Sequence, residues 1–353
     1  MAEKFLMKGN EALAEAAIRN GCKHFFGYPI TPQTEVAAYM AKRLPKIGGT
    51  YLQAESEVAA INMVLGCAST GTRCLTSSSS PGISLKGEGI SYIIGSDLPC
   101  VIINVMRGGP GLGGIQPSQA DYWQATKAPG HGDGQVLVFA PSSVQEIVNL
   151  IGRAFDKAET YRMPAMILAD GMLGQMMEPV EFPETTPAPH DKPWALTGTK
   201  GQRKPNIVNS LYLQPQELER TIVERQKRYD LIKENEVLVE EQFLDDAEFA
   251  VVAYGATARV VKSAVSKARE KGIKVGLIRP ITLWPFPMKE IAAAAQQVKA
   301  MLTVEMSMGQ MVEDVRLAAN GACPVSFFGR TGGIVPSPAE VLAEIEKMAG
   351  GAR

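Results

Sequence analysis

The first 170 residues alternate between two hydrophobic patterns. Apolar residues recurring every three or four positions predict amphipathic helices, and the short runs rich in β-branched residues between them predict buried strands. Helices are expected at 10–20, 34–43, 56–69, 84–96 and 143–159, and strands at 24–27, 50–53, 73–76, 100–106, 136–139 and 165–168. This alternation predicts an α/β fold with a doubly wound, mostly parallel sheet covered by helices.

A different composition follows this unit. Seven prolines occur between Pro179 and Pro215, and because proline has no N–H to donate, the stretch predicts an extended connector outside helix and sheet. The highly charged residues 216–241 come next, with apolar side chains on one side at Leu218, Ile222, Tyr229 and Ile232. That pattern predicts a long surface helix that packs one stripe against the body or a partner.

The alternation resumes at Phe249. Strands are expected at 249–254, 274–278, 301–305 and 325–328, with helices at 256–271, 287–295 and 311–320. A second, smaller doubly wound unit therefore follows the connector, and a length of 353 residues also suits about two domains. The expected division is a first domain at 1–178, a linker with a charged helix at 179–246, and a second domain at 247–353.

Composition narrows the function classes. Lysine and arginine number 36 against 37 aspartates and glutamates, a net charge of -1, so no overall positive field would attract nucleic acid or an anionic membrane. No apolar run approaches the roughly 18 residues of a spanning helix, and the N-terminus has no signal segment, so a cytoplasmic location is expected. Five cysteines without a C-x-x-C pair, and only three histidines, indicate neither a disulfide framework nor a metal site.

Three segments match the letter patterns of cofactor-binding motifs, but the residues around each of them do not fit the corresponding site. Residues 109–114 satisfy G-x-G-x-x-G, but Pro117 disfavours the helix that a dinucleotide-binding loop must open. Residues 82–87 have the glycine spacing of a P-loop, yet Glu88 stands where the phosphate-binding lysine belongs. Residues 132–134 resemble the start of a thiamine diphosphate motif, but no paired asparagine follows at the required distance. The chain is expected to lack its own Mg²⁺–diphosphate site.

Four polar loops follow four of the expected strands, at 28–32, 55–57, 76–82 and 107–113. Because carboxyl ends of parallel strands meet at one edge of a sheet, these loops would converge on one crevice. Structural roles remain open for each of them, namely helix capping by Thr31 or Thr34, a negative first helical turn at Glu55 and Ser56, and a surface salt bridge for Arg107.

The convergent side chains suggest what the crevice could do. Two prolines fix the direction of the Thr31 hydroxyl, and Arg107 beside glycines suits bidentate capture of a carboxylate. Glu57 precedes apolar residues 58–60 and is suited to sharing a proton with a ring nitrogen. The set holds no nucleophile–base pair and no metal ligands, so its chemistry would need a bound cofactor.

These residues resemble the α-type subunit of 2-oxoacid:ferredoxin oxidoreductases, which oxidatively decarboxylate 2-oxoacids to acyl-CoA with thiamine diphosphate. The matching segments are 9–12, 28–32, 55–57, 98–100, 107–110, 254–255, 283–287, 304–305 and 309–310. The resemblance covers nearly the whole chain. It implies a pyrimidine-binding domain of the thiamine diphosphate-binding fold, followed by a transketolase C-terminal-like domain.

The resemblance also implies roles for individual residues. Glu57 would hydrogen-bond the aminopyrimidine ring of thiamine diphosphate and so promote removal of the thiazolium C2 proton. Thr31 and Arg107, with Gly108, would hold the substrate carboxylate. The remaining implied cofactor-binding residues are Pro29, Ile30, Ser78 and Ser79.

Partner chains follow from what this chain lacks. In the family a β subunit carries the diphosphate and Mg²⁺ site, and a γ subunit and a ferredoxin-like δ subunit complete the complex. The resemblance therefore implies a thiamine diphosphate shared with the β subunit, with Mg²⁺ and [4Fe-4S] clusters on partners. It further implies CoA and a 2-oxoacid as substrates and ferredoxin as acceptor, and a chain that is inactive alone.

Residues 111–117 indicate the substrate. They differ from the Ser-Thr-Gly variant of 2-oxoglutarate enzymes and are similar to the branched-chain, 3-methyl-2-oxobutanoate (2-ketoisovalerate) group. Branched-chain 2-oxoacids are favoured, with 2-oxoglutarate as the alternative. Two other readings stay open, a β chain of a lipoamide-linked 2-oxoacid dehydrogenase and a non-catalytic scaffold subunit.

Overall fold

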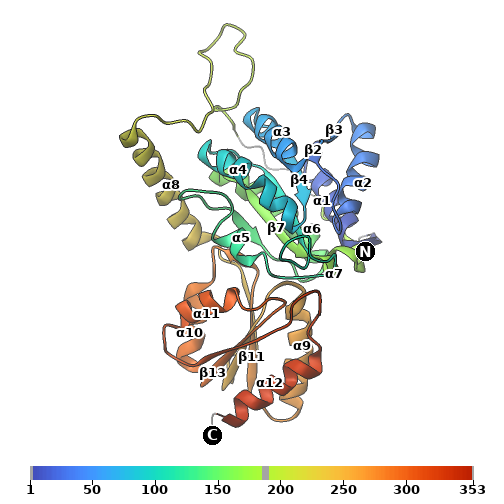
Figure 1. Cartoon of the computed structure of the whole chain (residues 1–353), viewed down its shortest axis with the longest axis vertical. Coiled ribbons are helices and arrows are strands. Elements are labelled where there is room, and N and C mark those ends of the chain that lie inside the picture. The colour runs from blue at the N-terminus through green and yellow to red at the C-terminus, as the bar shows by residue number, and fades with distance from the viewer. Residues whose placement is uncertain (1–2, 185–190, 352–353) are drawn as a thin grey trace.

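The computed structural model describes residues 3–184 and 191–351, and its two larger sheets lie one above the other in Figure 1. The first sheet has seven strands in the order β12-β6-β7-β5-β4-β2-β3. Their bounds are β2 His24–Gly27, β3 Thr50–Gln53, β4 Cys74–Ser78, β5 Val101–Met106, β6 Leu137–Phe139, β7 Ala165–Asp170 and β12 Thr282–Trp284. All neighbours pair in parallel except β12, which runs antiparallel to β6.

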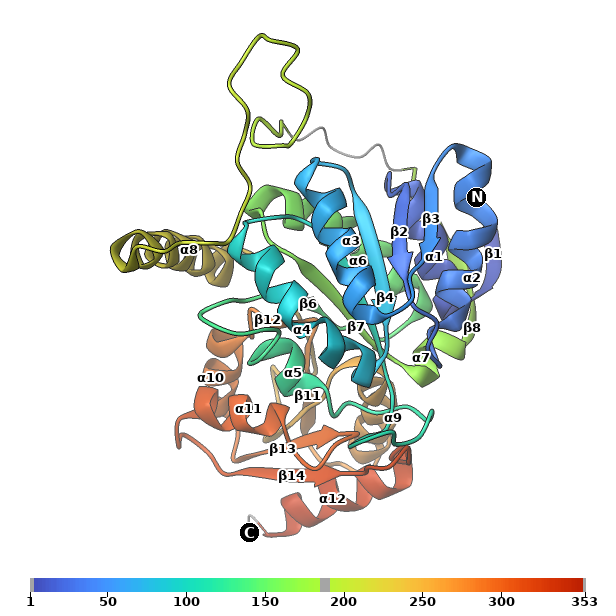
Figure 2. The same cartoon turned by 45° about the horizontal axis from the view of Figure 1, so that its top comes forward.

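Helices cover both faces of this sheet. The helices are α1 Gly9–Arg19, α2 Thr34–Arg43, η1 Leu44–Ile47, α3 Glu57–Ser69, α4 Ser80–Gly95, α5 Tyr122–Thr126, α6 Val144–Tyr161 and α7 Gly171–Gln175. Helix α1 packs against α2 and α6, whereas α3 packs against α4 on the other face (Figure 2). Strands β4, β5 and β7 are buried along their whole length. This matches the near-continuous apolar sequences of β5 and β7, whereas β4 buries a threonine and two serines.

The second sheet has five strands in the order β14-β13-β10-β11-β9. Its strands are β9 Val239–Gln242, β10 Phe249–Val252, β11 Val275–Pro280, β13 Ala300–Glu305 and β14 Val325–Gly329. Its helices are α9 Gly255–Glu270, α10 Met288–Gln297, α11 Met311–Ala319 and α12 Pro338–Gly351. Helix α9 packs with α12, and α10 packs with α11. Only β9 is antiparallel, so both sheets confirm the expected α/β, mostly parallel fold class.

The connector differs in part from expectation. Residues 191–214 form no helix or strand and extend from the body in Figure 1, while residues 185–190 of the expected connector lie outside the described residues. At its start, however, Met177–Glu181 forms β8, which pairs with β1 Lys4–Lys8. The expectation that this stretch avoids sheet was wrong at Pro179, because a two-stranded ribbon has free edges where proline need not donate.

The charged helix is shorter than its pattern predicts. Helix α8 covers Pro215–Asn235, and Val239–Gln242 is the edge strand β9. Tyr229 and Ile232 are buried, and Tyr229 packs edge-on against Trp284 with ring centroids 5.4 Å apart. Leu218 is exposed, since only the later turns of α8 reach the body.

Strand β12 lies within 247–353 in sequence but in the first sheet in space. The first sheet therefore draws on both of the expected units. Among the described helices, none is long and apolar enough to span a membrane.

Candidate active site

The expected strand-end loops meet where the first sheet changes direction. Chain order runs from β2 outward to β3 and then back to β4 on the other side of β2, so the switch point lies between β2 and β4. Ser77 at the end of β4 donates to Gln33 Oε1 at 2.5 Å, which joins the loop after β2 to the loop after β4. Thr31, Glu57, Ser78 and Arg107 all stand at this edge.

Glu57 opens helix α3 and is nearly buried, with 5% of its surface exposed. Ser56 caps the helix by accepting from Ala59 N at 3.2 Å. A Cβ on Gly82, in the first turn of α4, would lie 2.6 Å from Glu57 Oε1 and 2.1 Å from Ser78 Oγ. The carboxylate therefore rests against α4, and no hydrogen bond to it occurs within the described part of the chain.

The serine run divides into two pairs. Ser77 bonds Gln33, and Ser80 donates to Asp121 Oδ2 at 2.6 Å while its hydroxyl accepts from Arg107 N at 3.0 Å. Ser78 Oγ and Ser79 Oγ are buried and have no hydrogen-bond partner among the described residues. Such an orphaned hydroxyl costs roughly 1–3 kcal/mol, so this pair is the part of the run that is free to bind a ligand.

Asp121 belongs to the support of this edge. Burial raises the pKa of Asp121 above its usual value, although hydrogen bonds from Ser80 and Asn104 act in the opposite direction. Asn104 Nδ2 donates to the same carboxylate oxygen at 2.9 Å, and Asn104 Oδ1 accepts from Ser80 N at 3.2 Å. Asp121 and Asn104 thereby fix the start of α4, a role that the sequence did not reveal.

Arg107 is buried without a carboxylate partner among the described residues. Its guanidinium donates to Thr31 O at 2.9 Å and Leu112 O at 3.2 Å, and its Nε is buried and unpaired. A buried guanidinium normally sits against an anion, because removing its charge from water is costly. The guanidinium therefore does not form the surface salt bridge that the sequence left open.

Thr31 is exposed beside this guanidinium. Helix α2 begins at Thr34 after Gln33 with no side-chain cap, so neither threonine has the capping role. Gly108 is buried, and a Cβ there would stand 3.6 Å from Gly332 in the second unit. Pro29 and Ile30 lie in the same loop as Thr31, with Pro29 exposed, and neither side chain bonds another expected site residue.

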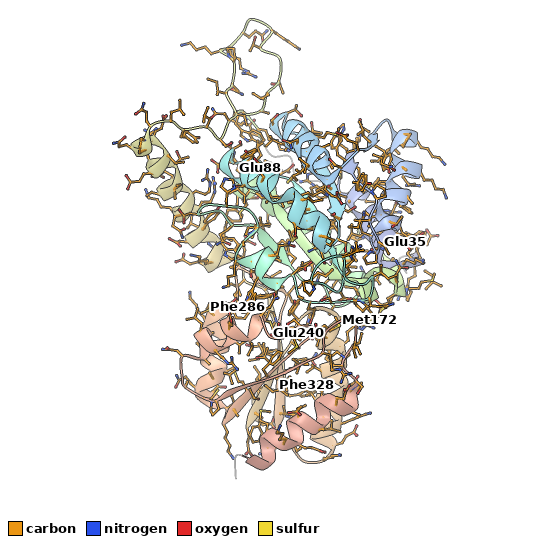
Figure 3. The ribbon with its side chains drawn as sticks, in the orientation of Figure 1. Glu35, Glu88, Met172, Glu240, Phe286 and Phe328 are labelled. Atoms are coloured by element: carbon orange, nitrogen blue, oxygen red, sulfur yellow. The ribbon has the colours of Figure 1, made fainter. Side chains whose placement is uncertain are left out.

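A cavity of about 750 Å³ opens next to Thr31. Figure 3 places the labelled Glu35 and Met172, which line it, on the same side of the molecule. The other lining residues are Thr31, Pro32, Ile115, Gln116, Pro117, Gly171, Gln175, Met176, Gly333 and Val335. The described lining is largely apolar and includes no lysine or arginine.

Lys86 is the residue that the sequence analysis missed. It is fully buried on α4, and its ammonium donates to Thr76 Oγ1 at 2.9 Å and Ser77 O at 3.1 Å. Burial lowers the pKa of Lys86 to about 7, and the nearby Glu57 opposes this shift. A signal was present, because Lys86 shares its helical face with Ile83 and Ile90.

Comparison with known proteins decides the family. Residues 15–242 match the family described as pyruvate flavodoxin/ferredoxin oxidoreductase, thiamine diphosphate-binding, and residues 247–341 match pyruvate:ferredoxin oxidoreductase core domain II. The chain is also 48% identical over 346 residues to ketoisovalerate oxidoreductase subunit VorB of Methanothermobacter marburgensis, covering 98% of each chain. This chain belongs to the 2-oxoacid:ferredoxin oxidoreductases.

Other relatives agree with this family membership. The 2-oxoglutarate synthase subunit KorA of Methanothermobacter thermautotrophicus is 35% identical, over 99% of this chain and 100% of the relative. The structure of 2-oxoglutarate:ferredoxin oxidoreductase from Magnetococcus marinus superposes with a TM-score of 0.87 at 26% identity, covering 98% of this chain and 65% of that chain. A split gene transketolase shares the fold, with a TM-score of 0.62 at 14% identity.

These comparisons confirm the expected family, the expected similarity to its ketoisovalerate group, and the oxidoreductase class. The first domain of this 2-oxoacid:ferredoxin oxidoreductase chain is a thiamine diphosphate-binding domain. Its geometry is consistent with that cofactor, since the Ser78 and Ser79 hydroxyls are buried without partners among the described residues, and Gly82 lets the Glu57 carboxylate lie against the first turn of α4. The relatives are named as subunits, so partner subunits are implied.

Proposed function

We propose that this chain is the α-type subunit of an enzyme that converts a 2-oxoacid and CoA to acyl-CoA and CO₂ while reducing ferredoxin. The buried Arg107 guanidinium, without a carboxylate partner and at the same sheet edge as Glu57, carries the proposal. A ligand carboxylate at Arg107 would complete the charge balance of the site. Bound thiamine diphosphate would supply the carbon nucleophile and electron sink that decarboxylation needs.

The chain's own residues have separable roles in this proposal. Arg107 holds the substrate carboxylate by charge-assisted hydrogen bonds, and the Thr31 hydroxyl and the Gly108 backbone complete that site. Glu57 holds a proton at the pyrimidine ring nitrogen. The hydroxyls of Ser78 and Ser79 and the loop residues Pro29 and Ile30 line the cofactor side.

The β subunit is assigned from exposed apolar side chains on α3, the helix that Glu57 opens, and on α4, which packs against it. Val58 on α3 and Leu85 and Tyr92 on α4 are 46%, 54% and 38% exposed, an apolar surface on the face of α3 and α4. We assign this surface to a β subunit that carries the diphosphate and Mg²⁺ site. The [4Fe-4S] clusters then lie on partner subunits, with γ and ferredoxin-like δ subunits completing the complex and ferredoxin as the external acceptor.

The cavity beside Thr31 favours a branched-chain substrate. Its lining offers apolar groups such as Ile115, Met172 and Val335, and no cation for a second carboxylate. The assembled complex should oxidise 3-methyl-2-oxobutanoate with a higher kcat/KM than 2-oxoglutarate or pyruvate. Faster turnover of 2-oxoglutarate would instead place the chain with its 2-oxoglutarate synthase relatives.

Glu57→Gln in the reconstituted complex tests the chemistry. Loss of the proton-holding group should lower kcat for 2-oxoacid-dependent ferredoxin reduction by about 10²- to 10⁴-fold. Glu270→Gln is the matched control, because Glu270 is exposed at the end of α9 in the second unit, away from the residues assigned to the site. Wild-type turnover by Glu57→Gln would refute the role of Glu57. Reduction of a lipoyl domain in place of ferredoxin, or a complex that binds no thiamine diphosphate, would refute the proposed function.

A further inference from the structure

Lys86 is a buried cation for which the proposed function has no role yet. It is fully buried, the only described lysine in that state, in the middle of α4 on the helix face that also carries the buried Ile83 and Ile90. A lysine in such a place is costly unless its charge has a partner. Two of its three ammonium protons have acceptors in Thr76 and Ser77, and both are uncharged.

Helix packing directs Lys86 toward Glu57. A Cβ on Gly89 would lie 2.4 Å from Ile61 Cγ2, and one on Gly82 would lie 2.6 Å from Glu57 Oε1. These two glycines, seven residues apart on one helix face, let α4 approach α3 closely. Helical side chains lean toward the helix N-terminus, so the Lys86 chain runs toward the turn of Gly82 and hence toward Glu57.

Other charged groups near α4 are already engaged. Asp121 accepts from Ser80 and Asn104 at the start of the helix, and Glu88 is exposed and accepts from Tyr92. Glu57 is the charged side chain whose field acts on Lys86. Glu57 in turn has no hydrogen-bond donor among the described residues, so its carboxylate is available as a counter-charge for Lys86.

We propose that Lys86 is a positioning residue that acts through Glu57, with its ammonium stabilising the ionised carboxylate. The inference rests on the proposed function for its catalytic consequence. When the Glu57 carboxyl gives its proton to the pyrimidine ring nitrogen, a carboxylate remains in a buried site, and the Lys86 ammonium offsets that charge. No proton leaves the site in this step, since the ring nitrogen gains the one that Glu57 loses.

The sign of the pH dependence follows from burial. The pKa of Lys86 is about 7 in the folded chain, below the 10.4 usual for an unfolded lysine. Between these values the unfolded chain binds more protons than the folded chain, so the contribution of Lys86 to stability rises with pH through that window. Below pH 7 the folded chain holds a buried ammonium, and the field of Glu57 reduces its cost.

Four full-length chains test the pair without catalysis: wild type, Lys86→Met, Glu57→Gln and the double variant. Urea unfolding from pH 5.5 to 10 should show wild type gaining stability over Lys86→Met as pH rises, with onset near pH 7. In the Glu57→Gln background the onset should move to lower pH, because the carboxylate that favours the ammonium is gone. An onset that is the same with and without Glu57 would overturn the proposal.

Lys299→Met is the matched control. Lys299 pairs with Glu248 on the surface of the second unit, and exposed ion pairs contribute little to stability, so its removal should leave both the urea midpoint and the onset unmoved. Should Lys86→Met fail to fold, Thr76→Val takes its place. It keeps the lysine and removes one acceptor, and it should lower the onset in the wild-type background.

The assembled complex tests the catalytic consequence. Lys86→Met should lower kcat by about 10- to 100-fold and change the number of protons exchanged when thiamine diphosphate binds, measured by calorimetry in buffers of different ionisation enthalpy. If Lys86→Met changes neither kcat nor the number of protons exchanged on binding, the proposal is overturned. If the wild-type complex oxidises no 2-oxoacid, the proposed function fails, whereas the unfolding cycle still decides whether Lys86 and Glu57 are coupled.

Discussion

The two larger sheets differ in the polar side chains at their switch points, which are unpaired in the first sheet and hydrogen-bonded in the second. In the first sheet, between β2 and β4, Ser78 Oγ, Ser79 Oγ and the nearby Arg107 Nε are buried and unpaired. In the second sheet the switch point lies between β10 and β13, and the buried side chain of Gln119 fills it. Gln119 Nε2 donates to Tyr254 O at 2.9 Å, and Gln119 Oε1 accepts from Thr257 Oγ1 at 2.7 Å and Met306 N at 3.0 Å.

Two glutamates show the same contrast. Glu305 ends β13, is fully buried, and accepts from Met311 N, Val312 N and Ser307 Oγ, each at 3.0 Å. Burial raises its pKa, while these hydrogen bonds act in the opposite direction. Glu57 is nearly as buried and accepts no hydrogen bond among the described residues. Topology alone therefore does not identify a binding edge, and unpaired polar atoms distinguish a site from a structural joint.

Arg107→Gln should have the largest effect of the substitutions that test this difference between the two sheets. It removes the guanidinium that we assign to the substrate carboxylate, so kcat/KM of the assembled complex should fall by about 10²- to 10³-fold, the range for one member of a buried charged pair. The free chain should keep its melting temperature within a few degrees. Exposed Arg316→Gln is the control for both measurements. A large loss of stability with normal kcat/KM would make Arg107 a structural residue.

Gln119→Leu should give the reverse result. It leaves Met306 N and Thr257 Oγ1 without the acceptor that Gln119 provides, and two such buried groups cost about 2–4 kcal/mol in the free energy of unfolding, measurable by denaturant unfolding of the full chain. The kcat/KM of folded complex should stay within about tenfold of wild type. Gln226→Leu on α8, where Gln226 bonds the exposed Asp230, should change neither. Activity lost without stability would contradict the structural assignment.

The serines should give the smallest effects. Ser78→Ala and Ser79→Ala remove hydroxyls that bond nothing in the free chain, so stability should be unchanged or higher by up to about 1 kcal/mol. Thiamine diphosphate should bind the assembled complex about fivefold more weakly, as titration would show. Ser80→Ala is the matched contrast and should lower stability, because Asp121 loses a 2.6 Å bond. Equal destabilisation by all three would remove the distinction between the two serine pairs.

Local patterns predicted much of this molecule. The short apolar runs located β2 and β3 at their observed bounds and β5 within one residue. Of these strands, β5 is buried along its whole length, as its nearly continuous apolar run predicts. The convergence of Thr31, Glu57 and Arg107 also followed from strand-end positions. Helix α4 was expected from Ser84 but starts at Ser80, since Pro81 suits a first helical turn as well as a loop.

Non-local features escaped prediction. Strand β12 is three residues long and pairs with β6, more than 140 residues earlier, and no local period encodes such a partner. Helix α8 ends at Asn235 because the next residues join the second sheet, although their charge pattern continues that of the helix. Which serines bond protein atoms depends on Asp121 and Gln33, and these partners are set by tertiary structure.

The position of β12 late in the sequence determines when the first sheet can be completed during synthesis. Residues up to Asp170 can form six of the seven strands of the first sheet, but the outer edge of β6 has no neighbour until the ribosome has delivered Trp284. Until then the backbone N–H and C=O groups of that edge are unpaired, and they can pair with a strand of another chain, including a second copy of this protein during its synthesis. The thiamine diphosphate-binding half of this chain therefore completes its sheet only after synthesis of the other half is well under way.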